Sequence, residues 1–412
     1  MSLGDPLPPR PRPPKISRSD AAFWRITAPL AFGGFSTFAL LYSVQPLMPM
    51  FAREFAVSPA LASLSLSATT ATLAVAMIGA GAVADIFGRK RVMVASLVAS
   101  SLAAMLAALA ANWPTLLGLR ALAGLALSGL PAVAMAYLSD EMDAQAIGLA
   151  MGLYIAGSTL GGMSGRLVVA ALSDHCGWRP AIAAAGAVGL VGAALIGFAL
   201  PASRRFAPRW PDFAGLAAPI RRHLAEPGLR LLFAEGFLLM GSFVCAYNYT
   251  GFRLAAPPFS LSQTAIGFIF VLYLVGAVSS MVMGDLAGRF GRRRVLWIAI
   301  AIEAAGVAAT LPDAIAAVIV GVGLITWGFF GAHSIVSSWV GLRAEGGRAQ
   351  AAALYLFFYY VGSSLVGSSG GLFYAAGGWP GVAALLAALS GIAVIVALRL
   401  SKIPPPRHLI PR

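Results

Sequence analysis

Ionisable side chains are scarce inside the long apolar segments of this chain, so each one there is a candidate for chemistry. Glu235 and His333 can each take up and release a proton, and Arg120 is a permanent cation. A charged group is expensive in lipid, so we expect Arg120 to face the interior of the protein or a cavity, with snorkelling to headgroups as the alternative. Proton coupling needs such a titratable group, and Glu235 is the favoured carboxyl. The alternative for Glu235 is a local salt bridge with Arg230 or with the arginines of residues 201–228.

A glycine-flanked basic motif occurs twice, 203 positions apart, and each copy sits between two apolar segments. The first copy comprises Gly81, Asp85, Gly88, Arg89 and Lys90. The second copy comprises Gly284, Gly291 and Arg292, with Gly288 where the first has its carboxylate. The glycines permit close approach and tight turns, and the carboxylate lies one helical turn before the first arginine. A repeat of half the chain length predicts two homologous bundles.

The composition is that of a membrane protein. The 412 residues are 59% hydrophobic and 11% charged, with a mean hydropathy of +0.83. Soluble surfaces need more charge than this, and the many small residues favour close packing of helices in lipid. The net charge of +14 lies between apolar runs and not on a basic stripe, so we expect no nucleic-acid partner.

Twelve apolar runs are long enough to span a bilayer. They are residues 26–48, 60–83, 92–111, 115–138, 147–171, 180–200, 230–252, 263–284, 295–311, 314–341, 350–374 and 380–400. With an inside N-terminus, 24 of the 29 Lys and Arg residues fall on the inner side. This bias predicts that both termini are cytoplasmic.

The runs predict an all-α membrane protein with two parallel six-helix bundles, over residues 26–200 and 229–400. We expect residues 1–25 to be a disordered Pro/Arg-rich tail, 201–228 a cytoplasmic linker and 401–412 a second tail. Part of the linker, 213–224, has the pattern of an amphipathic surface helix. A second repeat supports the two halves, because Gly157-Ser158-Thr159-Leu160-Gly161-Gly162 matches residues 362–367.

These motifs resemble those of the major facilitator superfamily, and the resemblance covers residues 26–400. It implies that Asp85 latches the cytoplasmic side by capping the start of the eleventh helix, near 348–352, when the transporter faces outward. The acidic cluster Asp140, Glu141 and Asp143 could pair with Arg89 or Lys90. The displaced acid of the second copy, Asp285, makes a second latch doubtful.

The resemblance extends to two further motifs. Arg120-Ala-Leu-Ala-Gly124 is similar to an Arg-x-x-Gln-Gly motif, which implies a place for Arg120 near the proton or substrate path. Residues 157–162 resemble the Gly-Pro-x-x-Gly-Gly signature of drug:proton antiporters, with Ser158 in place of proline. We expect Gly157, Gly161 and Gly162 to pack the fifth helix against the eighth. Residues 162–166, 42–46 and 237–242 resemble a bacterial branch of YnfM-like exporters, also labelled arabinose-efflux-like.

In this fold the substrate cavity lies between the halves. By depth, we expect it to be lined by Gln45, Thr69, Tyr154, Asn248, Tyr273, Trp327, Tyr359 and Tyr360. Aromatic walls suit an amphipathic or apolar solute. The resemblance places Glu303 on a peripheral helix, where we expect a structural partner for it.

The leading hypothesis is a monomeric secondary transporter of the bacterial inner membrane that exports a small organic solute in exchange for protons. The alternative is uptake of a sugar or organic anion, with Arg120 or Arg166 meeting a carboxylate. An enzymatic or non-transporting membrane protein is a remote third. No nucleotide-binding loop or metal-ligand cluster occurs in the sequence, so we expect no cofactor, no metal and no catalytic residues. The expected partners are the solute, protons and membrane lipid.

Overall fold

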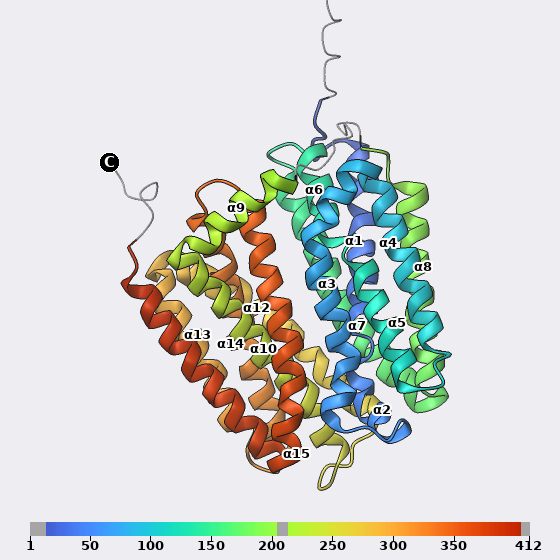
Figure 1. Cartoon of the computed structure of the whole chain (residues 1–412), viewed down its shortest axis with the longest axis vertical. Helices are drawn as coiled ribbons and strands as arrows, with labels where there is room; N and C mark the ends of the chain where they lie inside the picture. The colour runs from blue at the N-terminus through green and yellow to red at the C-terminus, as the bar shows by residue number, and fades with distance from the viewer. Residues whose placement is uncertain (1–13, 204–212, 405–412) are drawn as a thin grey trace, which may run out of the picture.

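The computed structural model describes residues 14–203 and 213–404, and within these ranges regular secondary structure is helical. The helices form two bundles that stand side by side (Figure 1). Both ends of the described chain lie at the same end of the molecule (Figure 1). There Ile16 pairs with Met142, and Arg293 donates to the Ile403 carbonyl at 2.9 Å. We call this end the tail side and the opposite end the far side.

The N-terminal bundle contains the helices from α1 to α8. They are α1 Ala21–Tyr42, η1 Gln45–Leu47, α2 Met48–Glu54, α3 Pro59–Phe87, α4 Arg89–Ala107, α5 Trp113–Leu127, α6 Pro131–Glu141, α7 Ile147–Cys176 and α8 Trp178–Ala199. Local sequence sets several of these boundaries. Ser58 and Asn112 cap α3 and α5 by accepting hydrogen bonds from the backbone N–H groups of Leu61 and Thr115.

The C-terminal bundle repeats this arrangement. It contains α10 Pro227–Ala255, α11 Gln263–Phe268, η2 Ile269–Leu272, α12 Tyr273–Phe290, α13 Arg292–Ala309, α14 Ile315–Arg343 and α15 Arg348–Lys402. The predicted linker helix is present as α9 Phe213–Ala225, which runs between the two bundles on the tail side (Figure 1). The other linker arginines, Arg204, Arg205 and Arg209, lie outside the described residues.

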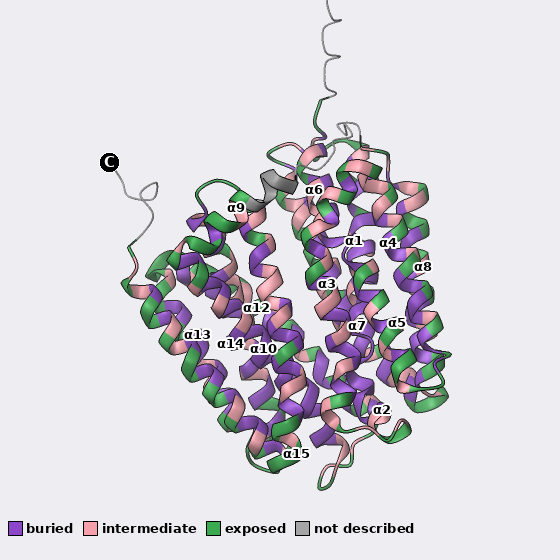
Figure 2. Cartoon of the chain, in the orientation of Figure 1, coloured by how far each residue is buried: buried purple, intermediate pink, exposed green. Residues whose placement is uncertain are grey.

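Ten stretches of the described chain are long and apolar enough to cross a membrane. The last of them contains two of the predicted spans, because α15 bends at Gly377 and Gly378, whose backbone angles are not helical. The predicted span 295–311 corresponds to α13, which has 18 residues and begins with three arginines. Exposed side chains on the outer faces of the bundles include many large apolar ones, as expected for surfaces in lipid (Figure 2).

The predicted disorder of residues 1–25 is wrong for the part that the structure describes. Lys15 donates to the Ser139 carbonyl at 3.0 Å, Ile16 is buried, and its backbone bonds Glu141 and Asp143 at the end of α6. Helix α1 therefore begins at Ala21, five residues before the predicted span. Burial of the apolar Ile16 side chain stabilises the ordered conformation of this short segment. Residues 1–13 and 405–412 of the predicted tails lie outside the described residues.

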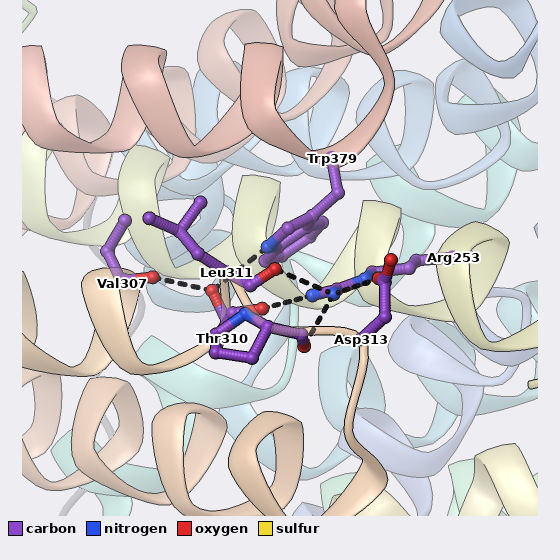
Figure 3. A network of polar contacts seen from close by, with 7 residues as sticks. Arg253, Val307, Thr310, Leu311, Asp313 and Trp379 are labelled. Atoms are coloured by element: carbon purple, nitrogen blue, oxygen red, sulfur yellow. Dashed lines mark hydrogen bonds and ion pairs between the residues drawn. The ribbon is translucent and has the colours of Figure 1, made fainter. Parts of the chain in front are cut away.

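The far side of the C-terminal bundle is fastened by Arg253 (Figure 3). Arg253 lies in the last turn of α10 and donates to the backbone carbonyls of Thr310, Leu311 and Pro312 and to the Asp313 carboxylate. Trp379 on α15 donates to the Thr310 hydroxyl at 2.9 Å. The loop between α13 and α14 is thus held to both α10 and α15. Arg179, Trp178 and Glu54 make a similar cluster in the N-terminal bundle.

Candidate functional site

A cavity of about 430 Å³ lies between the two bundles. The N-terminal bundle lines it with residues of α1, α3, α6 and α7, and the C-terminal bundle with residues of α10, α12, α14 and α15. A volume of this size is in the range that accepts a small organic molecule. The cavity is therefore the candidate site.

One wall of the cavity is aromatic and belongs to the C-terminal bundle. Phe243 and Phe329 stack with their ring centroids 3.9 Å apart. The His333 ring lies 5.0 Å from the Tyr359 ring, and Tyr359 meets Tyr360 edge to face at 5.2 Å. All five line the cavity. Such rings offer a large apolar contact surface with few hydrogen-bonding groups.

Arg166 of α7 supplies a permanent positive charge to the cavity wall. Its side chain is buried, donates to Gln45 Oε1 and to the Gly162 carbonyl at 2.6 Å each, and lies 3.9 Å from the Tyr42 ring and 4.8 Å from the Tyr273 ring. No Asp or Glu of the described residues forms an ion pair with it. A buried cation held only by neutral groups keeps its charge uncompensated, so it can attract an anion.

Hydrogen bonds between the two bundles close the far side of the cavity. Gln45 donates to Asn248 Oδ1 at 2.8 Å, which extends the Arg166 contact across to α10. The Asp174 carboxylate accepts bonds from the backbone N–H groups of Gln263 and Thr264 and from the Thr264 hydroxyl.

Nearer the middle of the bundles, two further pairs join α3 to α15. The hydroxyls of Thr70 and Ser364 are 2.7 Å apart, as are those of Ser67 and Ser368. The cavity lies on the tail side of these contacts, so the structure is closed at the far side.

The structure brings half of the predicted cavity residues to the cavity wall. Tyr154, Tyr273, Tyr359 and Tyr360 line it. The other four, Gln45, Thr69, Asn248 and Trp327, lie elsewhere. Gln45 and Asn248 bind each other in the far-side closure, Thr69 bonds the Arg120 carbonyl at 2.9 Å, and the Trp327 carbonyl accepts a bond from Ser279.

Arg120 does not line this cavity. It is buried between α1, α3 and α5, where it donates to the carbonyls of Ser65 at 3.1 Å, Leu40 at 3.3 Å and Leu41 at 2.8 Å. Leu40 and Leu41 lie near the far end of α1, where carbonyls lack partners within the helix. In this structure Arg120 joins helices together and does not face a solute.

The glycines of α7 pack against a different helix from the one predicted. A Cβ on Gly157 would lie 2.2 Å from the Ala31 carbonyl oxygen, and one on Gly161 would lie 2.0 Å from that of Phe35. Both neighbours belong to α1 and not to the eighth span, so the fifth span packs on the first. Gly162 has looser neighbours, among them Arg166 at 3.4 Å.

The same contact recurs in the C-terminal bundle. A Cβ on Gly362 of α15 would lie 2.1 Å from the Phe237 carbonyl oxygen on α10. The repeated glycine motif thus makes equivalent contacts in both halves.

Both copies of the basic motif form turns on the tail side. Gly88 ends α3 at φ +92° and Gly291 ends α12 at φ +90°, a conformation that glycine adopts at little cost. Arg89 and Arg292 begin the next helices, and Lys90 follows the first of them. Arg89 pairs with Asp140 at 2.5 Å, which confirms the predicted partner.

The predicted close approach at Gly81 is not seen, because nothing lies within 4 Å of its Cβ position. Gly284 has a single neighbour at 3.9 Å, on Ser334. Asp85 is exposed and makes no ion pair within the described residues. The bundles do not meet at these positions in this conformation.

The titratable candidates lie in the C-terminal bundle. His333 lines the cavity, and its Nδ1 atom is 2.7 Å from the Tyr355 hydroxyl. Glu235 and Glu303 are buried, and within the described residues none of their carboxyl oxygens has a hydrogen-bond partner. The alternative of a salt bridge between Glu235 and Arg230 is not seen. Ser242 of α10 is the polar side chain that faces Glu303.

The sequence analysis named Arg166 only in the alternative of organic-anion uptake, whereas the structure places its guanidinium at the cavity wall. Its position in α7, one helical turn after Gly162, was the available signal. No pattern in the sequence indicated which side chains surround Glu235, because its neighbours come from other helices.

Comparison with known proteins agrees with this architecture. The family model of the Major Facilitator Superfamily matches residues 30–254 and 238–412. The Inner membrane transport protein YnfM of Escherichia coli is 43% identical, with 94% of this chain and 93% of that protein covered. The MFS-type transporter YybF of Bacillus subtilis is 42% identical over 94% of this chain and 95% of its own length.

Among solved structures, a bacterial homologue of the lysosomal transporter Spinster, in an inward-facing and unoccupied conformation, superposes with a TM-score of 0.77. It is 16% identical, with 93% of this chain and 97% of that chain covered. This likeness concerns the fold. With the family match and the two bundles, it leads to one conclusion: the chain belongs to the Major Facilitator Superfamily and is a multi-pass membrane transporter, not an enzyme.

Proposed function

We propose that this protein exports a small organic solute through the central cavity by alternating access, in exchange for protons. The tail side is the cytoplasmic side in this proposal, so the structure represents a state that faces the cytoplasm. The bias of Lys and Arg residues toward that side supports the orientation. The closed far side and the cavity on the tail side of it support the conformation.

The observation that carries the solute chemistry is the combination of Arg166 with the aromatic wall. Arg166 offers an uncompensated cation at the far end of the cavity, and Phe243, Phe329 and Tyr359 offer apolar faces. An amphipathic solute with an anionic group satisfies both. A neutral sugar would leave the cation unmatched and would find few hydrogen-bonding groups.

Uptake of an organic anion is the second candidate, because the same cation and rings would serve transport in either direction. Direct measurement of flux separates the two. Inward movement of the anion together with protons would favour uptake, and outward movement against proton entry would favour export.

The gate of the tail side is part of the proposal. In the outward-facing state, Asp85 would cap the start of α15 near Arg348, and the open surroundings of Gly81 would be filled by the approaching bundle. The exposed position of Asp85 in the present state is compatible with a latch that is released.

Proteoliposome flux tests the proposal with three probes that share a ring and differ in charge: benzoate, benzamide and benzyltrimethylammonium. We expect transport of benzoate and little of the other two, with a rate that responds to an imposed pH gradient. Arg166→Ala should lower kcat/KM for benzoate about 100-fold, since truncating one partner of a buried charge pair costs a few kcal/mol. Arg53→Ala, which removes an exposed arginine on the far side, is the matched control.

Equal transport of benzoate and benzamide by the wild type would contradict the anionic solute. An Arg166→Ala variant with unchanged benzoate kinetics would remove Arg166 from the site. Flux that ignores the pH gradient would leave a facilitated transporter in place of an exchanger.

A further inference from the structure

The outer face of the N-terminal bundle has a groove of about 620 Å³ between α3 and α4, which we call the α3–α4 groove. The turn between α5 and α6 completes its lining. A Cβ on Gly79 would meet nothing within 4 Å, and Phe87 is 61% exposed at the tail-side end, so the groove opens outward. Its walls consist mostly of small side chains, among them Ala76, Gly79 and Ala80 of α3 and Ala95 and Ala99 of α4.

The polar groups in the deeper part of the α3–α4 groove are already satisfied. The Ser96 hydroxyl donates to the Ala126 carbonyl at 2.6 Å, and the Ser128 hydroxyl donates to the Leu125 carbonyl at 2.7 Å. A polar solute would lose hydrogen bonds to water there and would find none in exchange. The deeper part of the groove therefore suits a hydrocarbon chain.

The tail-side end of the groove is basic. Arg91 lines it, and Lys90 precedes Arg91 in the first turn of α4. Arg89 pairs with Asp140, but neither Lys90 nor Arg91 forms an ion pair within the described residues. The first turn of α4 contains no acidic residue. Two uncompensated cations next to the positive end of a helix dipole attract an anion.

A second hollow, of about 790 Å³, extends from Arg91 toward the end of α8 at Gly197. It shares Phe87, Arg91 and Ala95 with the α3–α4 groove, and Lys90 lines it as well. Arg91 thus lies where the two hollows meet. The space around the two cations is sufficient for a bulky headgroup.

The length of the α3–α4 groove matches one leaflet of a bilayer. Phe87 and Ala76 at its two ends on α3 are about 17 Å apart, and Arg91 and Ala99 on α4 about 12 Å, counted at 1.5 Å per residue. The hydrocarbon of one leaflet is about 15 Å thick, half of the bilayer core. An acyl chain whose headgroup lies at Arg91 would therefore stay within its own leaflet along the groove.

The equivalent positions of the C-terminal bundle, 203 residues later, have the basic end but larger side chains. Arg294 and Phe290 correspond to Arg91 and Phe87, and Phe290 is 62% exposed. The small groove residues Gly79, Ala95 and Ala99 correspond to Val282, Ile298 and Ile302. A basic turn is thus common to both halves, whereas the small residues that form the groove belong to the N-terminal half.

We propose that the α3–α4 groove binds an anionic phospholipid, with the phosphate at Lys90 and Arg91 and one acyl chain along the small residues of α3 and α4. Basic pockets between membrane-spanning helices are typical binding sites for anionic headgroups. The site lies within one bundle, so it depends neither on the proposed transport function nor on the latch at Asp85.

The headgroup is tested on the purified full-length protein by native mass spectrometry, with dioleoyl phosphatidylglycerol and dioleoyl phosphatidylcholine as probes. We expect the wild type to retain phosphatidylglycerol preferentially. Arg91→Ala should weaken its binding about fivefold and K90A/R91A about 30-fold, because each basic residue near a membrane surface contributes about fivefold. Arg294→Ala, the exposed counterpart, is the matched control and should bind like the wild type. Equal retention of both lipids by the wild type, or an equal loss in Arg294→Ala, would overturn the proposal.

The acyl chain is tested by filling the groove with the residues of the other half. The variant G79V/A99I does this, and the open Cβ position of Gly79 has room for the added atoms. A phosphatidylglycerol with a diazirine midway along one acyl chain should, on illumination, label residues 76–87 and 91–99 of the wild type.

This labelling should be lost in G79V/A99I while the protein remains monodisperse on size exclusion. Gly391→Val, at an equally open glycine of α15, should be labelled like the wild type. Unchanged labelling of G79V/A99I would exclude the groove as the site of the chain.

A second copy of the protein is the other occupant that a groove of small residues could accept. Light scattering coupled to size exclusion would then show a dimer that dissociates in G79V/A99I, and the mass spectra would show no preference for phosphatidylglycerol. That result would replace the lipid site by a contact between protomers.

Discussion

The two bundles share one helix arrangement but differ in the sign of the charges that they bury without an ion-pair partner. The N-terminal bundle buries Arg120 and Arg166 without a carboxylate partner, and the C-terminal bundle buries Glu235 and Glu303 without a cation partner. The arginines have hydrogen-bond acceptors, whereas the carboxyls have no hydrogen-bond partners among the described residues. The arginines of the N-terminal bundle carry a permanent charge, whereas the carboxyls of the C-terminal bundle can be neutralised by a proton.

The contrast also shows that structural likeness and chemical likeness are separate properties of the repeat. Gly88 and Gly291 adopt the same backbone conformation, and Gly157 and Gly362 make the same kind of helix contact. These positions maintain the shared scaffold. The buried charged residues Arg120, Arg166, Glu235 and Glu303 have no charged counterpart at the position 203 residues away in the other half, so they are free to differ in function.

Among the substitutions considered for the N-terminal bundle, removal of the Arg120 side chain should lower the free energy of unfolding most. Arg120→Ala leaves the carbonyls of Ser65, Leu40 and Leu41 without this donor and opens a void among α1, α3 and α5. We expect the free energy of unfolding to fall by about 3 kcal/mol. Denaturant titration in mixed micelles measures this, with the exposed Arg53→Ala as control. A loss of transport with full stability would instead place Arg120 on the solute path.

Alanine in place of the close-packed glycines tests whether the two halves remain alike. Gly157→Ala and Gly362→Ala each place a methyl group against a backbone carbonyl of the neighbouring helix, so each should destabilise by about 2 kcal/mol. Gly148→Ala on α7 and Gly391→Ala on α15 are matched controls, because their Cβ positions are open. Thermal unfolding of the four variants reports the result. A large effect in only one half would show that the contacts are not equivalent.

The ion pairs on the tail side differ in burial, which predicts different sensitivities. Arg343 and Glu226, 2.8 Å apart, are 4% and 29% exposed, whereas Arg89 and Asp140 are 14% and 40% exposed. Glu226→Gln should therefore cost about 1.5 kcal/mol of stability, and Asp140→Asn a few tenths. Unfolding at neutral pH compares the two, and equal losses would contradict the role of burial.

The Glu226 pair also predicts a pH dependence. Burial alone would raise the pKa of this carboxyl, but hydrogen bonds from Arg343 and from the N–H groups of Leu229 and Gly228 hold its pKa below the usual value. A lowered folded-state pKa means that the contribution is complete above the unfolded-state pKa of about 4.3 and is lost as the pH falls through the folded-state pKa. Stability measured from pH 7 downward should decline less in Glu226→Gln than in the wild type.

An effect of the opposite sign is expected from the buried carboxyl Glu303. Glu303→Leu removes a buried polar group that has no partner in the described chain and fills its place with apolar atoms. We expect a gain of about 1 kcal/mol in the free energy of unfolding. A destabilised Glu303→Leu would indicate that the carboxyl has a structural role.

Much of the fold follows from local patterns in the chain. The apolar runs predicted the helices, and the two basic motifs predicted turns that Gly88 and Gly291 form with the same positive φ. The predicted boundary of the disordered tail was wrong, because the burial of one apolar residue, Ile16, orders the short segment before α1. The predicted partner of the α7 glycines was also wrong, because a glycine pattern indicates a close helix contact but does not indicate which helix makes it.

The site was less predictable for the same reason. Depth along a helix correctly placed Tyr154, Tyr273, Tyr359 and Tyr360 on the cavity, but depth does not fix the direction of a side chain. Thr69 and Trp327 have suitable depth and face other helices. The surroundings of Glu235 depend on the packing of α15 on α10, where Tyr355 lies against Gly236, and these helices are not consecutive in the chain.

The hydroxyl pairs between α3 and α15 have a consequence for the energy of switching. When Thr70 and Ser364 separate, each keeps a backbone acceptor within its own helix, the Leu66 carbonyl at 3.3 Å and the Tyr360 carbonyl at 2.8 Å. Parting the bundles there leaves no donor stranded in an apolar medium. The two conformations can therefore lie within a few kcal/mol of each other, so that a bound solute can decide which is populated.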